Sequence, residues 1–189
     1  MTTRVAVVTG AAQGIGEAIA LRLAHDGFDV AILDIRGKEE QMQAVAQKIN
    51  DSGRRSQWIV GDVSDESSVK DAVESVVQTL GGLDVVHIFT IGYAVDLFQR
   101  SWCLIPIQMV ANAGFVNKHS RTIVECMFIE RKFHITILMV ICIASTEEWD
   151  AIFAVHARGT MLSFKYAAIQ MIKQGRGGRL IGQLQNSLA

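Results

Sequence analysis

The chain has 189 residues, half of them hydrophobic, and a formal net charge of −1. This length suits one domain with a real core and is short for two. The balanced charge gives no reason to expect nucleic acid or an anionic membrane surface as a partner. Three cysteines without a CxxC spacing predict neither a disulfide framework nor a zinc site, so we expect no metal and a reducing environment.

No segment has the pattern of a membrane anchor or a secretion signal. The first residues lead directly into a strand-like run, without the apolar segment of a signal peptide. The longest apolar run, residues 133–144, falls well short of the ~20 residues that a membrane-spanning helix needs. We therefore expect a cytoplasmic protein without membrane contact.

The first half of the chain alternates between strand-like and helix-like patterns. Short β-branched runs predict strands at residues 4–10, 28–34, 55–63 and from residue 83 onward. Apolar residues at helical spacing predict helices at residues 14–27, 37–53 and 64–82. This alternation predicts an α/β fold, a doubly wound parallel sheet of the Rossmann type with helices on both faces. For the third helix we expect Ser64 as the N-cap, with Asp65 and Glu66 in the first turn.

Three glycines follow the first predicted strand with the spacing G-x-x-x-G-x-G. Gly10 permits a sharp turn, Gly14 lets the backbone come close to a phosphate, and Gly16 allows close packing of helix on sheet. The N-terminus of the following helix offers free N–H groups and a positive dipole end to a pyrophosphate. The pattern predicts a dinucleotide site, and the alternative is a glycine-rich turn without a ligand.

Asp34 ends the second predicted strand, 18 residues after Gly16. An acidic group at this place takes the hydroxyls of the adenosine ribose. Because a carboxylate repels a 2′-phosphate, Asp34 favours NAD over NADP, and the nearby Arg36 weakens that preference only a little.

The segment "TGAAQGIG", residues 9–16, resembles the T-G-x-x-x-G-x-G cofactor loop of the short-chain dehydrogenase/reductase family. "GDV", residues 61–63, resembles the adenine-contacting end of that family's third strand, and "NAG", residues 112–114, its turn after the fourth strand. Residues 149–182 resemble its long fifth helix and the start of its fifth strand. Residues 146–155 and 171–182 are similar to the diacetyl/acetoin reductase branch.

The resemblance implies an oxidoreductase that transfers a hydride between NAD and a small carbonyl or secondary alcohol. It also implies a homo-oligomer for the intact family member. The residues that it assigns to cofactor binding are Thr9, Gly10, Gln13, Gly14, Ile15, Gly16, Asp34, Ile35, Asp62, Val63, Asn112, Ala113 and Gly114.

The catalytic residues that the resemblance implies are missing from this sequence. The family has a serine after its fifth strand and a Y-x-x-x-K pair on the next helix, with the tyrosine as general acid/base. Here Tyr93 and Tyr166 are followed four positions later by Leu97 and Gln170, and the resemblance ends after Gly182. We therefore expect a sheet that is incomplete on its C-terminal side, with residues 177–182 as an exposed edge, and a truncated chain that is inactive and does not form the family's oligomer.

His156 stands in "HARGT" where the family has a catalytic asparagine in N-x-R-G-T. Two interpretations of His156 remain open. It holds a water in place of the asparagine, or it is a substitution that serves helix packing.

We expect residues 1–189 to form a single domain. Two blocks in it, residues 86–108 and 126–144, interrupt the pattern of the family. Without the first block the sequence reads "GLDVMVANAG". That block begins with valine, whose codons start with GT, and ends with glutamine, which CAG encodes; the second block can also be encoded with intron ends. Translated introns are therefore the preferred interpretation, and genuine hydrophobic insertions are the alternative. We expect a block inside a buried strand to leave strand backbone unpaired.

Two functions follow for the chain. The first is the oxidoreductase described above, defective as written. The second is a protein that binds a dinucleotide or a partner without catalysing a reaction.

Overall fold

The computed structural model describes residues 3–89 and 146–182. Its strands are β1 Val5–Thr9, β2 Asp29–Asp34, β3 Ser56–Val60, β4 Val85–Ile88 and β5 Arg179–Gly182. Its helices are α1 Gly14–His25, α2 Glu39–Asp51, α3 Glu66–Leu80, α7 Thr146–Phe153, the π-helical η1 Ala154–Arg158 and α8 Gly159–Gln174. Residues 112–114 and the second block lie outside the described residues.

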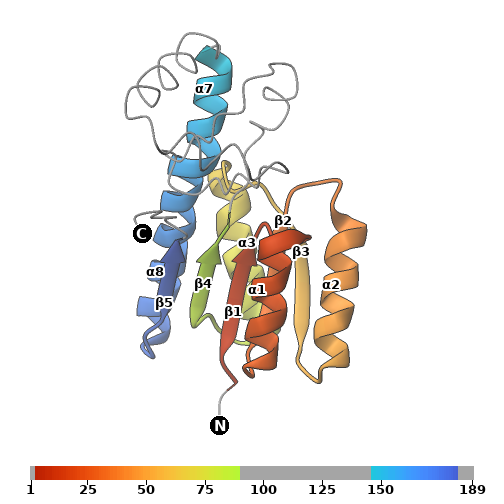
Figure 1. Ribbon diagram of the computed structural model, residues 1–189. Coiled ribbons are helices and arrows are strands. Elements are labelled where there is room, and N and C mark those ends of the chain that lie inside the picture. The colour runs from red at the N-terminus through yellow and green to blue at the C-terminus, as the bar shows by residue number, and fades with distance from the viewer. Residues whose placement is uncertain (1–2, 90–145, 183–189) are drawn as a thin grey trace, which may run out of the picture.

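The five strands form one parallel sheet in the order β3-β2-β1-β4-β5 (Figure 1). The chain runs outward from β1 to β3 and then returns to build β4 and β5 on the other side of β1. Ligands of such sheets bind at the carboxyl ends of the strands where the order reverses, which here is between β1 and β4. The predicted doubly wound α/β fold is confirmed.

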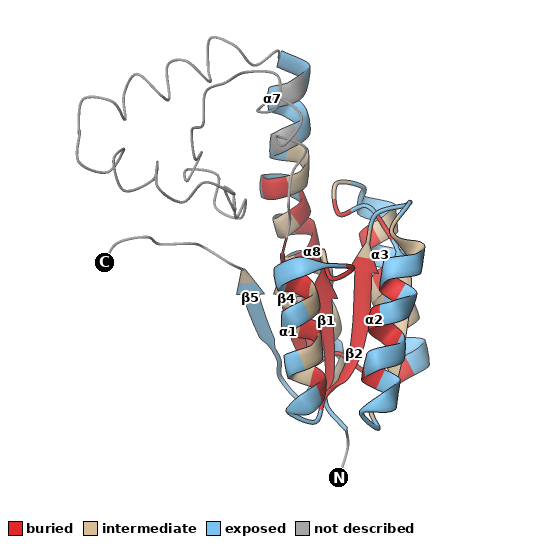
Figure 2. Cartoon of the chain, turned by 45° about the vertical axis from the view of Figure 1, so that its right-hand side comes forward, coloured by how far each residue is buried: buried red, intermediate tan, exposed pale blue. Residues whose placement is uncertain are grey.

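Helices cover both faces of the sheet and bury the central strands. On one face α1 and α2 pack against the sheet around Val8, Ile32 and Met42. On the other face α3 and α8 pack around Val7, Val76 and neighbouring apolar side chains. All five residues of β1 are buried, because its β-branched side chains meet helices on both faces (Figure 2).

The N-cap of α3 is Asp65 rather than the predicted Ser64. The carboxylate of Asp65 accepts a hydrogen bond from the Ser68 N–H at 2.8 Å, which satisfies a free donor of the first turn. Ser64 is engaged elsewhere, since its N–H and hydroxyl both donate to Asp62 Oδ1. Sequence reasoning missed this because both residue types are good caps and only the turn before the helix decides between them.

Strand β4 takes three of its four residues from the first block, residues 86–108. Val86 pairs with Val7 of β1, and His87 pairs with Val8 of β1 and Ile181 of β5. The expectation that this block leaves strand backbone unpaired is therefore wrong, because its first residues are apolar enough to complete the strand. His87 carries a cost, since its buried Nδ1 atom has no hydrogen-bond partner in the described part of the chain.

The long helix that the resemblance predicts within residues 149–182 is present but not uniform. The five residues Ala154–Arg158 are π-helical and separate α7 from α8. Directly after them, Gly159 lies so close to β3's end that an added Cβ would come within 2.9 Å of Val63 Cγ2. A π segment inside an α-helix often occurs at functional sites. It was not predictable from apolar spacing.

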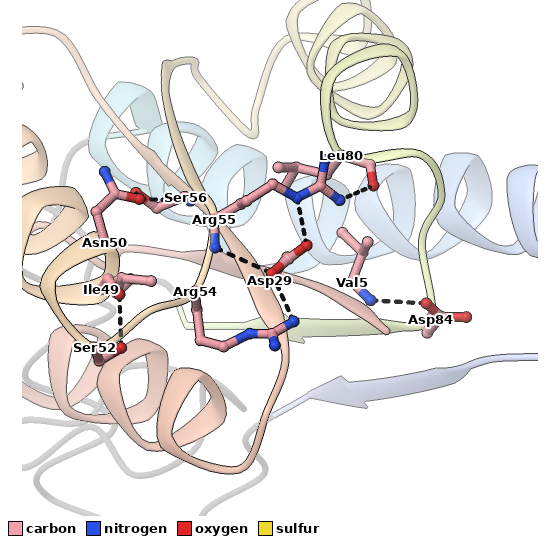
Figure 3. Close-up of polar contacts among 10 residues, drawn as sticks. All are labelled: Val5, Asp29, Ile49, Asn50, Ser52, Arg54, Arg55, Ser56, Leu80 and Asp84. Atoms are coloured by element: carbon pink, nitrogen blue, oxygen red, sulfur yellow. Dashed lines mark hydrogen bonds and ion pairs between the residues drawn. The ribbon is translucent and has the colours of Figure 1, made fainter. Parts of the chain in front are cut away.

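An ion-pair cluster stabilises the amino ends of the strands (Figure 3). Asp29 is 2% exposed, and its carboxylate contacts Arg54 Nη2 and Arg55 Nε, each at 2.8 Å. It also accepts from the Arg55 N–H, while Arg55 Nη2 donates to the Leu80 carbonyl at the end of α3. The cluster thus joins β2, β3 and α3 at one point.

Strand β5 lies at the edge of the described sheet, as predicted for residues 177–182. Leu180 and Ile181 are 39% and 41% exposed. An exposed apolar edge strand is a template for pairing with other chains. Among the described residues, no helix is both long and apolar enough to cross a membrane.

Candidate functional site

A cleft of about 220 Å³ opens at the carboxyl ends of the strands. Its walls come from the glycine-rich turn after β1, from the ends of β2 and β3, from Phe89 after β4 and from Val155 in η1. This is the position where the strand order reverses. The carboxyl ends of parallel strands meet at one edge, so residues far apart in sequence converge there.

The glycine-rich turn has the backbone geometry that its spacing predicts. Gly10 and Gly14 both have φ +63°, a left-handed conformation that glycine adopts without steric cost. An added Cβ on Gly16 would clash with the Gly10 carbonyl oxygen, so only glycine lets α1 begin this close to the turn. At Gly14 an added Cβ would meet no described atom within 4 Å, which leaves the backbone of the turn accessible.

The first turn of α1 has no side-chain cap among the described residues. Gln13 occupies the N-cap position with extended backbone, and its amide oxygen instead accepts a hydrogen bond from Lys38 Nζ at 3.3 Å. Gln13 and Lys38 both line the cleft. The N–H groups of a first helical turn and the positive end of the helix dipole favour an anion here.

Asp34 lies in the cleft wall and also holds the glycine-rich turn in place. Its Oδ2 accepts a hydrogen bond from the Ala12 N–H at 2.9 Å, and its Oδ1 accepts one from the Ile35 N–H at 2.9 Å. A carboxylate has about four acceptor sites, so two stay available to hydroxyl donors of a ligand. Ile35 lines the cleft beside it and is 38% exposed.

Thr9 joins β1 to the end of β4. Its hydroxyl donates to the Phe89 carbonyl at 3.1 Å and accepts from the Phe89 N–H at 2.9 Å. Phe89 is 1% exposed, and its Cδ1 lies 3.3 Å from the position of a Cβ built on Gly10. The aromatic ring is thus packed against the glycine-rich turn.

The two candidates at the end of β3 differ in their positions. Val63 lines the cleft and is 8% exposed. Asp62 is exposed outside the described cleft wall, where its carboxylate accepts from the Ser64 N–H and hydroxyl at 2.8 and 2.7 Å. Of the remaining candidates, Ile15 is 39% exposed and also lies outside that wall.

His156 lies in η1, next to the cleft residue Val155, and is 4% exposed. Its backbone carbonyl accepts a hydrogen bond from the Thr160 hydroxyl at 2.7 Å. Burial lowers the pKa of the imidazole below its ordinary value of 6.5. The side chain is therefore neutral at pH 7, which is compatible with both interpretations of this residue.

The stability of the fold should depend on two imidazoles, the half-buried one of His87 and the buried one of His156. Burial lowers the pKa of both imidazoles below 6.5. At pH values near and below 6.5, the unfolded chain therefore binds more protons than the folded chain. The free energy of unfolding is therefore highest above pH 6.5, and it decreases as the pH falls toward the pKa values of the two imidazoles in the folded chain. We expect the urea midpoint to decrease when the pH falls from about 7.5 to about 5.5.

The control for this dependence is the double variant His87→Val/His156→Asn. Its urea midpoint should vary less over the same pH range, because both titrating groups are gone. A midpoint that stays constant or rises on acidification in the parent chain would contradict the prediction.

Tyr166 does not have the environment of a catalytic tyrosine. Its hydroxyl donates to Glu66 Oε1 at 2.7 Å, on the exposed surface where α8 meets the first turn of α3. Lys165 Nζ contacts the same oxygen at 2.7 Å. The carboxylate raises the pKa of the phenol, whereas a proton-transferring tyrosine needs a lowered pKa.

Of the residues that the sequence predicts, the structure brings a subset together around one cleft: Thr9, Gly10, Gln13, Asp34, Ile35 and Val63. Gly14, Ile15 and Gly16 follow this turn but do not line the described cleft. Sequence reasoning missed Lys38, Phe89 and Val155, which also line the cleft. The position of Phe89 directly after a strand was an available signal. Among the described residues, no group of three or more His, Cys, Asp or Glu side chains could hold a metal ion.

A parallel doubly wound sheet, with a glycine-rich turn into a helix and a carboxylate at the end of the second strand, defines a dinucleotide-binding class of protein. Residues 4–101 match the family model described as short chain dehydrogenase. Since this match covers more than half of the chain, the protein belongs to the short-chain dehydrogenase family, a family of oxidoreductases that use NAD or NADP. The resemblance drawn from the sequence motifs is confirmed.

Individual relatives agree with this assignment. A short-chain dehydrogenase/reductase of Armillaria gallica is 38% identical over 179 residues, which cover 95% of this chain and 52% of the relative. The structure of an acetoin dehydrogenase from Salmonella typhimurium is 31% identical with a TM-score of 0.63, and the match covers 95% of this chain and 54% of that one. A carveol dehydrogenase from Mycobacterium avium, solved in complex with NAD, shares the fold at 23% identity and a TM-score of 0.65, over 95% of this chain and 53% of that one. The chain therefore spans about half the length of these relatives.

Proposed function

We propose that this chain is the cofactor-binding part of an NAD-dependent short-chain dehydrogenase that acts on a small carbonyl or secondary alcohol. The observation that carries the proposal is the cleft at the reversal of strand order, where Gly10 and Gln13 of the glycine-rich turn and Asp34 at the end of β2 line the same space. NAD supplies hydride transfer when it is bound. The described residues contribute the anion-binding turn and a hydroxyl acceptor.

The preference for NAD and the substrate class rest on different observations. Asp34 brings a negative charge to the place of the ribose hydroxyls, which disfavours a 2′-phosphate. Lys38 in the cleft wall and Arg36 beside it oppose this preference in part, but neither removes the carboxylate. For the substrate, 31% identity to an acetoin dehydrogenase supports a small carbonyl of the diacetyl or acetoin kind.

We expect Asp34→Ala to weaken NAD binding by about 10- to 100-fold, since hydrogen bonds to a charged group contribute about 1.5–3 kcal/mol. The change also removes the acceptor of the Ala12 N–H and so loosens the turn for both cofactors. The ratio of the NADP and NAD dissociation constants, measured by calorimetry, is therefore the readout, and it should shift toward NADP.

The matched control is Asp71→Ala, which removes the same charge from an exposed position on α3. It should leave both dissociation constants unchanged. Equal affinity for the two cofactors before and after the Asp34 change would overturn the assignment of Asp34.

We expect the 189 residues by themselves to transfer no hydride to diacetyl or acetoin. The sequence contains no Tyr-x-x-x-Lys pair, and Tyr166 is held protonated by Glu66 away from the cleft. NADH oxidation followed at 340 nm, with protein purified from a host without the corresponding reductases, measures this. Turnover above background that disappears in His156→Ala would contradict the expectation and assign the proton transfer to His156.

The second candidate is a protein that binds a dinucleotide without catalysis. The observation that favours it is the same absence of a Tyr-x-x-x-Lys pair from the sequence. The transcript discriminates between the two candidates. In the first, residues 86–108 and 126–144 are translated introns, and a spliced message lacks both and continues past Gly182 into Tyr-x-x-x-Lys. In the second, the full message encodes the chain as written.

A further inference from the structure

A smaller cavity, with a volume of about 20 Å³, lies between the sheet and α3. Thr9, Leu33 and Val63 line both this cavity and the cleft, so their side chains form the partition between the two spaces. All residues of the cavity wall are buried except Ile59 and Val73, which are half-buried. The cavity therefore belongs to the interior of the domain rather than to its surface.

The cavity arises because short side chains meet on this face of the sheet. Helix α3 contributes Val69, Ala72 and Val76 to its wall, and the strands contribute Val7 and Ala31. Short side chains on both sides of a helix–sheet interface leave space between them. Protein interiors contain few voids larger than a water molecule, and this one exceeds the ~10–15 Å³ that one water needs.

The wall of the cavity offers few partners to a water molecule. Its polar side chains are those of Thr9 and Ser163. The Thr9 hydroxyl already donates to the Phe89 carbonyl and accepts from the Phe89 N–H, and the lining strands pair with one another within the sheet. Since a buried water makes about two to four hydrogen bonds, Ser163 by itself does not hold one. The cavity therefore favours an apolar guest over water.

We infer that this cavity is a binding site for an apolar molecule of one or two heavy atoms, such as dioxygen. Its volume has room for a single molecule of about this size. The guest gains dispersion contacts with valine and alanine methyl groups that otherwise face empty space. Burial in this cavity also removes the apolar surface of the guest from water. The ligand class differs from the dinucleotide proposed for the cleft, and the inference does not depend on that proposal.

The test uses the full chain with labelled valine methyl groups, under dioxygen and under nitrogen at the same pressure. Dioxygen is paramagnetic, so it accelerates the relaxation of the methyl groups that it approaches closely. Val45 provides an internal control, because it lies on α2 against the opposite face of the sheet and is 2% exposed, whereas Val76 is 1% exposed. We expect the Val76 and Val7 methyl groups to relax several times faster than those of Val45.

Two results on the parent chain would overturn the inference. The first is equal paramagnetic relaxation at Val76 and Val45, because dioxygen would then enter both faces only in proportion to their exposure. The second is a nuclear Overhauser effect between water and the Val76 methyl groups, which would show that a water molecule occupies the cavity.

The variant Val76→Ile adds one methyl group to a side chain of the cavity wall and should fill most of the space. The excess relaxation at Val7 should then disappear. Val45→Ile is the matched control, since it makes the same change on the opposite face and should leave the excess at Val7 as it is in the parent. An unchanged excess in folded Val76→Ile would contradict the assignment, and the comparison within the parent chain decides if that variant does not fold.

Discussion

Asp29→Ala should lower the free energy of unfolding by about 3 kcal/mol, a large part of the ~5–15 kcal/mol that a domain has. The expected loss lies at the lower end of the ~3–5 kcal/mol measured for broken buried ion pairs. The reason is that Arg54 and Arg55 are 27% and 59% exposed and regain water when the carboxylate is removed.

The loss remains large because Asp29 joins three elements at one buried point. Its oxygens accept from Arg54 Nη2, from Arg55 Nε and from the Arg55 N–H. In the alanine variant this backbone N–H loses its partner, and Arg54 Nε already has none among the described residues. Desolvated donors without partners cost about 1–3 kcal/mol each.

Urea denaturation followed by circular dichroism measures this effect. Asp26→Ala is the matched control, because Asp26 is an exposed acid that also pairs with an arginine, Arg22, at 3.0 Å. Its unfolding midpoint should stay at the parent value. Equal midpoints for Asp29→Ala and the parent would show that the cluster does not stabilise the fold.

Deletion of residues 86–108 should raise the solubility of the chain, and its exchange at the position of His87 should favour the fold. The deletion joins Val85 to Met109, so counting along the strand puts Val110 at the position of His87. This exchange replaces a half-buried imidazole, whose Nδ1 has no partner in the described residues, by an aliphatic side chain. Removing such a group gains about 1–3 kcal/mol. The same count puts smaller residues, Ala111 and Asn112, at the buried positions of Ile88 and Phe89, and these exchanges oppose the gain.

The shorter connection contributes little to this gain. Loop-closure entropy changes by only about 0.6 kcal/mol for a doubling of loop length, and the deletion shortens the segment between β4 and α7 by less than half. The single variant His87→Val isolates the effect of the imidazole, because it should raise the unfolding midpoint without a change in length or in the neighbouring buried residues.

Solubility is measured as the fraction that stays in the supernatant after expression. The exposed side chains of Leu180 and Ile181 remain in the deletion variant, so we expect its solubility to increase but the variant to remain partly insoluble. Lower solubility after the deletion would show that residues 86–108 belong to the folded protein, and would refute the intron proposal.

Much of the fold could be predicted because it depends on local patterns. The β-branched runs around Val7 and Ile32 and the helical spacing of apolar residues place four strands and three helices correctly within two or three residues. The cap of α3 and the π segment at His156 could not be predicted. Each depends on a competition between nearly equal local hydrogen bonds that the surrounding packing decides.

For the site, the sequence by itself determined the glycine-rich turn, because Gly10, Gly14 and Gly16 are needed for backbone reasons that act within a few residues. It also determined that an acid stands at the end of β2. Only the tertiary structure decided that Asp34 accepts from the Ala12 N–H and that Phe89 packs against Gly10 in the cleft wall. Thr9 and Phe89 are 80 residues apart, and no local pattern encodes such a contact, because it arises when parallel strands align their carboxyl ends.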